Sequence, residues 1–204
     1  MLVPDRFGCD IGSEVYTSVK PGGTMPSRRI DDLVADLRPM ATTLIQNCRA
    51  RGIEMRPYET LRSPLEQGKI WRQSRTREQV RAKILELRAA GAEYLAFCIE
   101  SVGPQSGQHV TDAPPGLSWH QWGEAFDSFW VINGEAEWST TRKVNGLNGY
   151  HVYAEEAEKL GLTAGGLWQR FKDWPHAQLK SERGPQLLFS LTEIDQTMRQ
   201  RFGS

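Results

Sequence analysis

The sequence predicts an α+β domain, because helical and strand-like apolar patterns occur in separate parts of the chain. Residues 28–51 and a segment that begins at residue 76 repeat apolar side chains at the three- and four-residue spacing of a helix. Residues 125–132 instead alternate between two sets of side chains, as a strand does. The length of 204 residues fits a single domain, 1–204, or one domain with an extra lobe.

The first predicted helix covers residues 28–51 and follows an irregular N-terminal arm, residues 1–26, which is rich in glycine and proline. Pro39 is expected to kink this helix, because proline lacks the amide hydrogen of the helical hydrogen bond. Gly52 ends the helix, and residues 53–56 then form a short strand.

Capping boxes predict where the next two helices begin. Ser63 and Glu66 have the spacing at which a side chain and a backbone amide satisfy each other at a helix start. Thr76 opens a second capping box, and the helical segment 76–102 that follows is one helix or a pair broken near Gly91.

The rest of the chain combines loops with short elements. Residues 103–117 and 133–149 are predicted loops, and residues 150–160 are a predicted short helix. A last helix is predicted around residues 191–202, within the C-terminal segment 190–204.

Charge and hydropathy exclude several classes of protein. The chain has 25 basic and 25 acidic residues, so there is no electrostatic case for a nucleic-acid partner. No run approaches the roughly 20 apolar residues of a membrane helix, so no membrane insertion is expected. The N-terminus lacks a charged start followed by an apolar run, so we expect no signal peptide and synthesis in the cytoplasm.

The cysteines predict neither a disulfide framework nor a Cys-x-x-Cys metal site. Cys9, Cys48 and Cys98 are odd in number and widely spaced. Cys48 and Cys98 fall on apolar helical stripes, where reduced cysteine acts as a small core side chain.

Two potential metal ligands, His120 and Asp127, lie in the segment 118–127. Their odd separation would send them to opposite faces of one continuous strand, so the chain is expected to turn between them at Gly123. We therefore place His120 on a loop or bulge that enters the sheet and Asp127 on the strand. A carboxylate among apolar neighbours needs a partner, and a metal ion is such a partner.

A second segment, Asp173-Trp174-Pro175-His176, supplies the other half of this candidate site. Pro175 favours extended backbone before it, and a polyproline II turn of three residues would project Asp173 and His176 to the same side. Two histidines and one carboxylate leave a coordination position open, as catalytic zinc sites do. Asp173 is then a candidate general base.

Each of these residues also has a simpler interpretation. His120 taken alone is better explained as a core or surface histidine, and only the joint pattern points to a metal. His109 and His151 have no comparable partners and are not predicted to be ligands. For most of five tryptophans that could line a groove we expect packing: Trp119, Trp122, Trp130, Trp168 and Trp174.

These motifs together resemble the VanY-like zinc peptidases of peptidoglycan, which include D-alanyl-D-alanine carboxypeptidases and phage endolysins. Residues 62–67 are similar to the family's Arg-Ser-x-x-x-Gln stretch, and residues 110–113 resemble the endolysin branch. The match covers about residues 53–178 in ordered pieces. The main motif consists of Ser118, His120, Gly123, Ala125 and Asp127, followed by Asp173 and His176.

The resemblance implies a fold and a zinc centre. The fold is the small α+β zinc-peptidase fold shared with hedgehog and DD-peptidases, in which helices flank a central antiparallel sheet. The Zn²⁺ ion would be held by His120, Asp127 and His176, with Asp173 as the catalytic base.

The resemblance also implies substrate contacts. Arg62 would contact the substrate and developing negative charge, and Ser118 and Gln67 would lie near the substrate. From its sequence position alone, Arg62 lies just before a helix start, where it could form a fork to a carboxylate or be an ordinary surface arginine. The helical segment 76–102 is longer than in compact members, which suggests an insertion that shapes the groove, and Ala177-Gln178 after the last ligand departs from the usual residues.

The implied activity is cleavage of peptidoglycan stem peptides, as an L-alanyl-D-glutamate endopeptidase of the endolysin type. Such a protein would act at the cell wall or periplasm after release, and we expect a monomer. A D-alanyl-D-alanine carboxypeptidase is the alternative within the same class. A non-catalytic peptidoglycan-binding or virion structural domain is the alternative from another class, and the intact ligand set with Asp173 argues against it.

Overall fold

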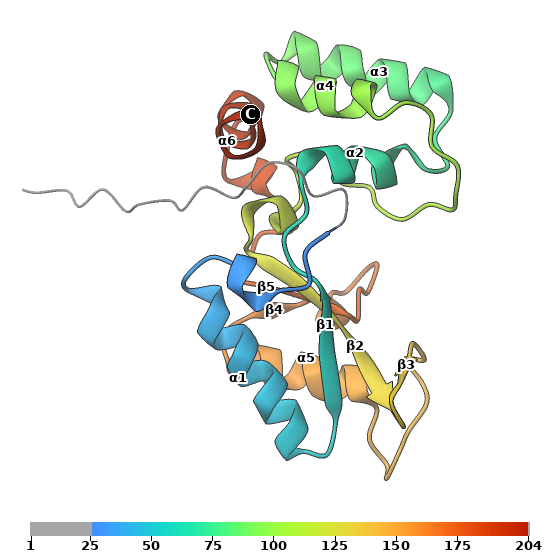
Figure 1. Ribbon diagram of the computed structural model, residues 1–204, viewed down its shortest axis with the longest axis vertical. Helices are drawn as coiled ribbons and strands as arrows, with labels where there is room; N and C mark the ends of the chain where they lie inside the picture. Colours follow the sequence, from blue (N-terminus) through green and yellow to red (C-terminus); the bar gives the residue numbers. More distant parts are fainter. Residues whose placement is uncertain (1–25, 204) are drawn as a thin grey trace, which may run out of the picture.

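The computed structural model describes residues 26–203, so the predicted arm, residues 1–26, lies outside the described part except for Pro26. Figure 1 shows a group of helices (α2, α3, α4 and α6) above a small sheet that α1 and α5 cover on one side. Helices combined with an antiparallel sheet confirm the predicted α+β class.

The sheet is built around its longest strand, β2. Its strand order is β1-β2-β5-β4, and β3 pairs with the far end of β2. All these pairings are antiparallel. The strands are β1 (Glu54–Glu59), β2 (Ala125–Ile132), β3 (Glu135–Glu137), β4 (Thr163–Ala164) and β5 (His176–Gln178).

Helices α2 and α3 begin at the predicted signals. Both predicted capping boxes are formed, at Ser63 and at Thr76. The segment 76–102 is a pair of helices broken at Gly91, whose φ of 76° is in the left-handed region. The α-helices are α1 (Leu37–Ala50), α2 (Pro64–Arg72), α3 (Arg77–Ala89), α4 (Glu93–Ser101), α5 (Gly149–Lys159) and α6 (Leu191–Phe202). The 3₁₀ helices are η1 (Ile30–Asp32), η2 (Trp119–Trp122), η3 (Gly165–Leu167) and η4 (Pro185–Leu187).

Three local predictions are wrong. Helix α1 begins at Leu37, so Pro39 lies in its first turn, where the amide has no helical partner to lose and no kink results. The first strand continues past Pro57 to Glu59. The predicted loop 133–149 contains β3, which is short and mostly polar and therefore lacks an apolar alternation signal.

Two hydrophobic cores hold the chain together. In the lower core, α1 and α5 pack on the sheet face that carries Phe126 and Trp130. In the upper core, α3, α4 and α6 enclose residues such as Leu95 and Ile194 together with Trp119 of η2. The two described cysteines, Cys48 and Cys98, are fully buried and free, which confirms their predicted packing role.

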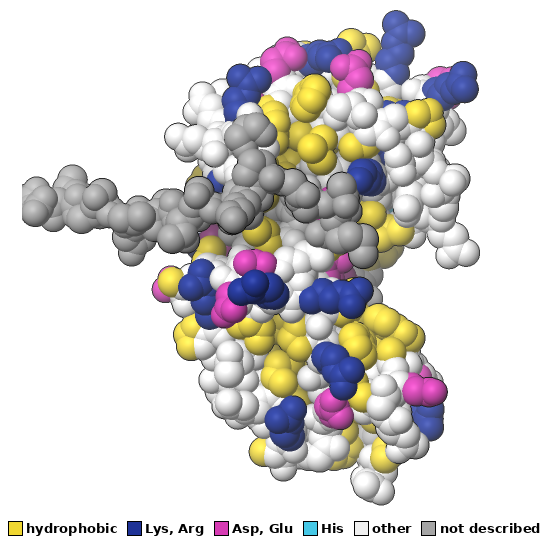
Figure 2. All heavy atoms as spheres, in the orientation of Figure 1, with side chains coloured by type: hydrophobic (Ala, Val, Ile, Leu, Met, Phe, Trp, Pro, Cys, Tyr) yellow, Lys and Arg dark blue, Asp and Glu magenta, His cyan; other side chains and the backbone are white. Residues whose placement is uncertain are grey.

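The described surface matches the balanced composition. Figure 2 shows basic and acidic side chains of both signs scattered over the two lobes of the face in view, with hydrophobic side chains between them. Among residues 26–203, no helix is both long enough and apolar enough to cross a bilayer.

Glycine allows α2 to pack closely on α4. A Cβ atom added at Gly68 would lie 2.4 Å from the backbone oxygen of Cys98. This close approach fixes the position of Gln67, which is adjacent on α2 and fully buried.

We expect Gly68→Ala to destabilise the protein by about 1–3 kcal/mol, because the added methyl overlaps a backbone atom that cannot rotate away. The measurement is urea unfolding, with Lys69→Ala on the same helix as the control. A stabilised Gly68→Ala protein, which is what helix propensity alone would give, would contradict this packing argument.

Candidate active site

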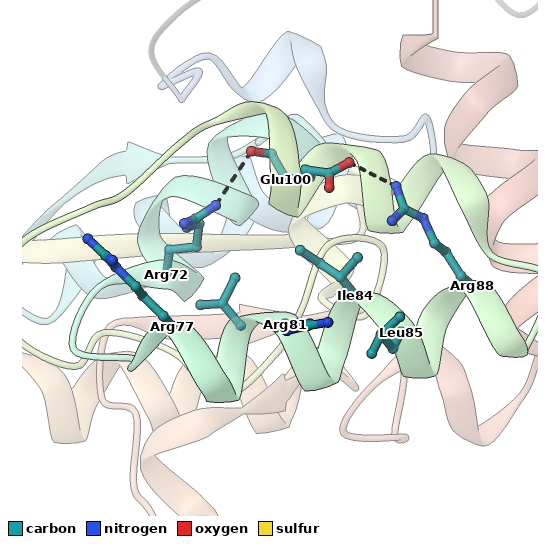
Figure 3. Close-up of a pocket in the computed structure, with 8 residues that line it drawn as sticks. Arg72, Arg77, Arg81, Ile84, Leu85, Arg88 and Glu100 are labelled. Atoms are coloured by element: carbon teal, nitrogen blue, oxygen red, sulfur yellow. Dashed lines mark hydrogen bonds and ion pairs between the residues drawn. The ribbon is translucent and has the colours of Figure 1, made fainter.

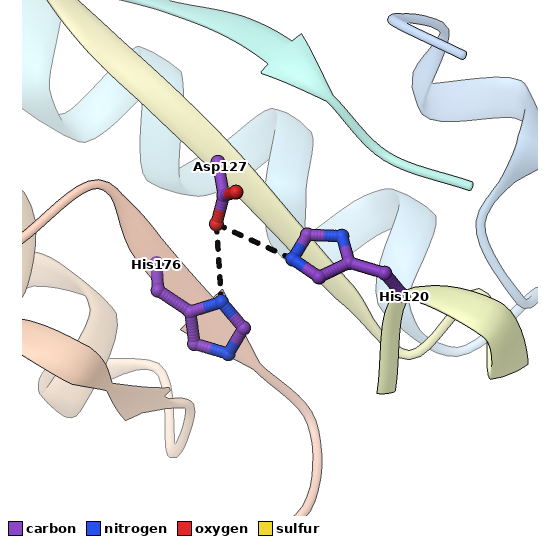
Figure 4. Close-up of side chains that lie close together, drawn as sticks. All are labelled: His120, Asp127 and His176. Carbon is purple, nitrogen blue, oxygen red and sulfur yellow. Dashed lines mark hydrogen bonds and ion pairs between the residues drawn. The ribbon is translucent and has the colours of Figure 1, made fainter. Parts of the chain in front are cut away.

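Three side chains from separate segments converge on one point beside β2. Asp127 lies on β2, His176 is its antiparallel partner on β5, and His120 lies on η2. One ligand atom from each residue lies within 4.8 Å of the other two, and all three residues are buried (Figure 4). Gly123, with a φ of 70°, makes the predicted turn between η2 and β2.

Outer hydrogen bonds determine which nitrogen of each imidazole faces the centre. His120 Nδ1 lies 2.9 Å from the Thr60 carbonyl oxygen, which can only accept, so Nδ1 carries the proton. His176 Nε2 lies 2.9 Å from Gln178 Oε1. The Gln178 amide is oriented by donating to the carbonyl oxygens of Lys180 and Glu182, so His176 Nε2 is also a donor.

The nitrogens left for the centre are therefore His120 Nε2 and His176 Nδ1. They lie 3.4 Å and 3.0 Å, respectively, from Asp127 Oδ1. Metal-bound histidines normally donate their other N–H to a carbonyl or carboxylate oxygen in this way. The donor set and its hydrogen bonds thus fit a divalent metal ion with two nitrogen ligands and one oxygen ligand.

Asp127 and His176 stabilise each other's charged forms despite their burial. Burial by itself would raise the pKa of the Asp127 carboxyl, but its interactions with His120 and His176 outweigh burial and hold that pKa well below its usual range. Burial would lower the pKa of His176, but the hydrogen bond and charge of Asp127 raise it. The centre is therefore suited to a cation in contact with the Asp127 carboxylate.

Asp173 reaches the same centre by a turn and not by the predicted polyproline geometry, which is a wrong detail of the sequence analysis. The His176 amide donates to the Asp173 carbonyl oxygen at 3.2 Å, which closes a turn through Trp174 and Pro175. A Cβ atom added at Gly165 would lie 2.4 Å from the Asp173 carbonyl oxygen, so only glycine allows this turn to pack so closely.

The Asp173 side chain lies at the exposed rim of the site. Desolvation by the surrounding protein raises the pKa of its carboxyl, His176 lowers it, and Asp127 raises it again, with a net upward shift. A carboxyl with a raised pKa beside a metal centre is suited to accept and return a proton.

A bulge in β1 brings Glu59 next to the site. The register of β1 and β2 shifts between Pro57 and Glu59, so that Glu59 pairs with Asp127. Glu59 forms a close ion pair with Arg62, whose side chain is buried. Bulges commonly re-aim side chains next to active sites. The Arg62 charge acts on both Asp127 and Asp173, and burial lowers its own pKa.

Gln67 is the centre of a buried hydrogen-bond network behind Arg62. Its Oε1 accepts from Arg62 Nη1 at 2.7 Å and from Gln121 Nε2 at 2.9 Å, and its Nε2 donates to the Ala113 carbonyl oxygen at 2.6 Å. Gln67 therefore holds Arg62 in place. Ser118 lies at the start of η2, where its amide donates to Gln121 Oε1 at 3.3 Å, and its predicted substrate contact stays a prediction.

The remaining histidines lie outside this group of ligands, as expected. His109 is exposed and pairs with Asp112 at 3.1 Å. His151 stacks on Trp174 with ring centroids 4.4 Å apart. Trp168 lies against His176 at 5.4 Å, so it belongs to the wall of the site and not to the core.

A cavity of about 490 Å³ lies elsewhere, on the helical lobe. Figure 3 shows it lined by arginines of α2 and α3, with Glu100 of α4 paired to Arg88 at 2.8 Å. None of the converging side chains lines this cavity, so the candidate site is identified by its chemistry and not by the size of a cavity.

Sequence analysis missed four residues that orient the site. They are polar residues near the recognised motifs, without a spacing signal of their own, and their roles depend on strand register and side-chain orientation: Glu59, Thr60, Gln121 and Gln178. Gln178 alone was mentioned, as a departure from the family pattern, and its orienting role was missed.

The converging His-Asp-His group beside β2 and β5 suits a metal ion, and this donor set is typical of hydrolytic zinc sites that keep a coordination position open. The chain matches the family model described as VanY, D-alanyl-D-alanine carboxypeptidase, over residues 31–164. The chain therefore belongs to the VanY family, which confirms the predicted peptidase class. The matched region contains His120 and Asp127 but ends before Asp173 and His176.

Two individual proteins are also similar. The curated relative is the peptidoglycan L-alanyl-D-glutamate endopeptidase CwlK of Bacillus subtilis, 28% identical over 152 residues, which span 71% of this chain and 74% of the relative. The L-Ala D-Glu endopeptidase ChiX of Serratia marcescens has a solved structure that aligns with a TM-score of 0.37 and 19% identity, over 74% of this chain and 83% of that chain.

We expect Gln67→Leu to destabilise the fold by about 2–4 kcal/mol, because the Arg62 and Gln121 donors and the Ala113 acceptor lose a buried partner. Gln67→Glu keeps an acceptor for both donors, so its loss of stability should be smaller. Chemical denaturation of the two variants measures this difference, and equal stabilities would show that the network does not hold Arg62.

Proposed function

We propose that the protein is a zinc-dependent peptidase that cleaves the L-alanyl-D-glutamate bond of peptidoglycan stem peptides. The observation that carries the proposal is the convergence of His120 Nε2, His176 Nδ1 and Asp127 Oδ1, with the Asp173 carboxyl beside them. A catalytic site needs both the ligands and a proton carrier, and a binding module needs neither.

The proposed ligands are His120, Asp127 and His176. Zinc suits a set of two nitrogens and one carboxylate oxygen, although other first-row metals accept the same donors and availability also decides. When bound there, zinc would supply Lewis acidity that polarises the scissile carbonyl and lowers the pKa of water.

The other proposed roles follow from position and charge. Asp173 accepts a proton from the attacking water and returns it to the leaving amine, for which its raised pKa and exposed position are suited. Arg62, held by Glu59 and Gln67, presents its charge to the oxygen that becomes negative or to a substrate carboxylate. Ser118 is assigned to the substrate side of η2, and Gln67 acts by positioning Arg62.

Similarity to an individual relative favours the endopeptidase over the carboxypeptidase. The relative CwlK is described as an L-alanyl-D-glutamate endopeptidase and is covered over 74% of its length. The family description names D-alanyl-D-alanine carboxypeptidase, so that activity is the second candidate. We further propose that the protein is a monomer and a single domain with the α3–α4 pair as an insertion, and that it acts at the cell wall.

For metal binding, we expect one zinc per chain in the wild-type protein and none in His120→Ala. Gln178→Leu should weaken zinc binding about 10- to 100-fold, because His176 loses the acceptor that orients its ring. Titration of the apo protein with zinc against a competing chelator measures both effects. Unchanged affinity in both variants would place the metal elsewhere.

For catalysis, we expect Asp173→Asn to retain zinc and to lose about 10²- to 10⁴-fold in kcat, because the proton carrier is removed. Asp112→Asn is the matched control, since that side chain is 90% exposed and its ion pairs are with Arg75 and His109, which are not candidate ligands. The assay is digestion of purified sacculi, with mass spectrometry of the fragments.

The fragments also identify the bond. Peptides that begin with D-glutamate would establish the endopeptidase, and free D-alanine would establish the carboxypeptidase. Binding of sacculi by zinc-loaded protein without any cleavage would overturn the enzymatic proposal in favour of a wall-binding domain.

A further inference from the structure

An aromatic surface adjoins the candidate site on the open face of the sheet. Alternation along β2 places Phe126 and Trp130 in the core under α1 and α5 and leaves Asp127 and Phe129 on the opposite face. The metal-ligand candidate Asp127 therefore shares its side of the sheet with an aromatic ring two residues further along.

Three rings form this surface, which we call the aromatic strip: Tyr58, Phe129 and Trp138. Their centroids are 6.0 Å apart for Tyr58 and Phe129, 5.5 Å for Tyr58 and Trp138, and 5.8 Å for Phe129 and Trp138. Trp138, which follows β3, is 55% exposed. Tyr58 and Phe129 beside it are half-buried, so the three rings form a contiguous apolar patch, and such patches mark binding surfaces where singly exposed apolar side chains do not.

The strip is continuous with the candidate site. Tyr58 lies at the β1 bulge, next to Glu59, which pairs with Asp127. Its hydroxyl is close enough to Asp127 and Asp173 for both charges to act on it. A substrate held at the ligand group therefore extends over Tyr58 toward Trp138 if it runs along β2.

The chemistry of the strip suits a sugar. One face of a pyranose ring carries C–H groups, which are attracted to the negative face of an aromatic ring. Arg56 lies at the edge of the strip, with its guanidinium carbon 5.9 Å from the Phe129 centroid, and it pairs with Glu54 at 2.8 Å. Flanking donors and acceptors of this kind match sugar hydroxyl groups.

The proposed cleavage site also places a sugar at the right distance. In a stem peptide, the rest of the L-alanine residue and a lactyl group separate the L-alanine carbonyl from the muramic acid ring, which is about two residue lengths. This spacing is at most roughly 7 Å. Asp127 and Phe129 are two residues apart on one strand, which is also roughly 7 Å.

We propose that the aromatic strip is a subsite for the muramyl sugar to which the stem peptide is attached. The inference rests on the proposed L-alanyl-D-glutamate specificity. The D-alanyl-D-alanine bond lies several residues further along the stem, at roughly 17 Å from the sugar when the stem is extended. With that bond at the ligand group, the sugar would not reach the aromatic strip.

The test compares two substrates that share one scissile bond. One is the stem peptide with an acetylated N-terminus, and the other carries the N-acetylglucosaminyl-N-acetylmuramyl disaccharide. We expect the wild-type protein to cleave the sugar-bearing substrate with about three- to tenfold higher kcat/KM, mainly through KM, because stacking adds binding energy. Trp138→Ala should lose most of this advantage, and Trp138→Phe should retain it.

Phe97→Ala is the matched control, because Phe97 is 51% exposed but lies on α4 in the helical lobe. Its ratio of kcat/KM for the two substrates should equal the wild-type ratio. Equal cleavage of both substrates by the wild-type protein would overturn the sugar subsite and leave the proposed function intact. An equal loss on both substrates in Trp138→Ala would also overturn it.

A binding measurement separates the inference from the proposed function. The disaccharide alone is titrated into ¹⁵N-labelled protein, and the Trp138 indole signal is assigned from Trp138→Phe. A shift of that signal supports the subsite, whether or not either substrate is cleaved. A shift without cleavage of either substrate would contradict only the proposed bond specificity. No shift at saturating disaccharide, or a shift produced equally by a sugar-free peptide, would overturn the subsite.

Discussion

A carboxylate buried between two imidazoles is the constraint on which the rest of the structure depends. Asp127 is nearly inaccessible to water, and burying its charge is costly unless partners surround it. The partners, His120 and His176, come from segments that lie far apart in the chain and meet only because β2 pairs with β5 and follows η2 directly. The central position of β2 in the sheet is therefore also the condition for the site.

The groups around the ligands are as specifically arranged as the ligands themselves. A backbone carbonyl at Thr60 and an amide oxygen at Gln178 each accept the outer N–H of one imidazole, which leaves one nitrogen of each ring directed at Asp127. Thr60 directly follows β1 and Gln178 is the last residue of β5, so the sheet fixes the position of both acceptors. Orientation by fixed neighbours reduces the reorganisation needed when a cation binds.

The helical lobe contributes to the site through hydrogen bonds rather than through ligands. Gln67 on α2 and Gln121 on η2 connect Arg62 to the loop at Ala113, and α2 is held in place by its close packing on α4 at Gly68. On the other side, the β1 bulge directs both Glu59 and Tyr58 to the open face of the sheet. The site is thus bounded by a polar network on the helical side and by aromatic rings on the sheet side.

The sequence by itself determined the fold class, the starts of α2 and α3 and the residues that converge on the candidate centre, because capping boxes, periodicity and ligand-type residues are local signals. Strand β3 pairs with the adjacent strand β2 and was missed because it is short and polar, and the true start of α1 was not signalled either. The β1 bulge depends on pairing with a distant part of the chain. The turn at Asp173 and the two imidazole tautomers were likewise decided only in the folded chain. The β1 bulge and the orientation of His120 require partners 60 or more residues away, and the turn at Asp173 requires the close backbone approach at Gly165; no local pattern encodes such contacts.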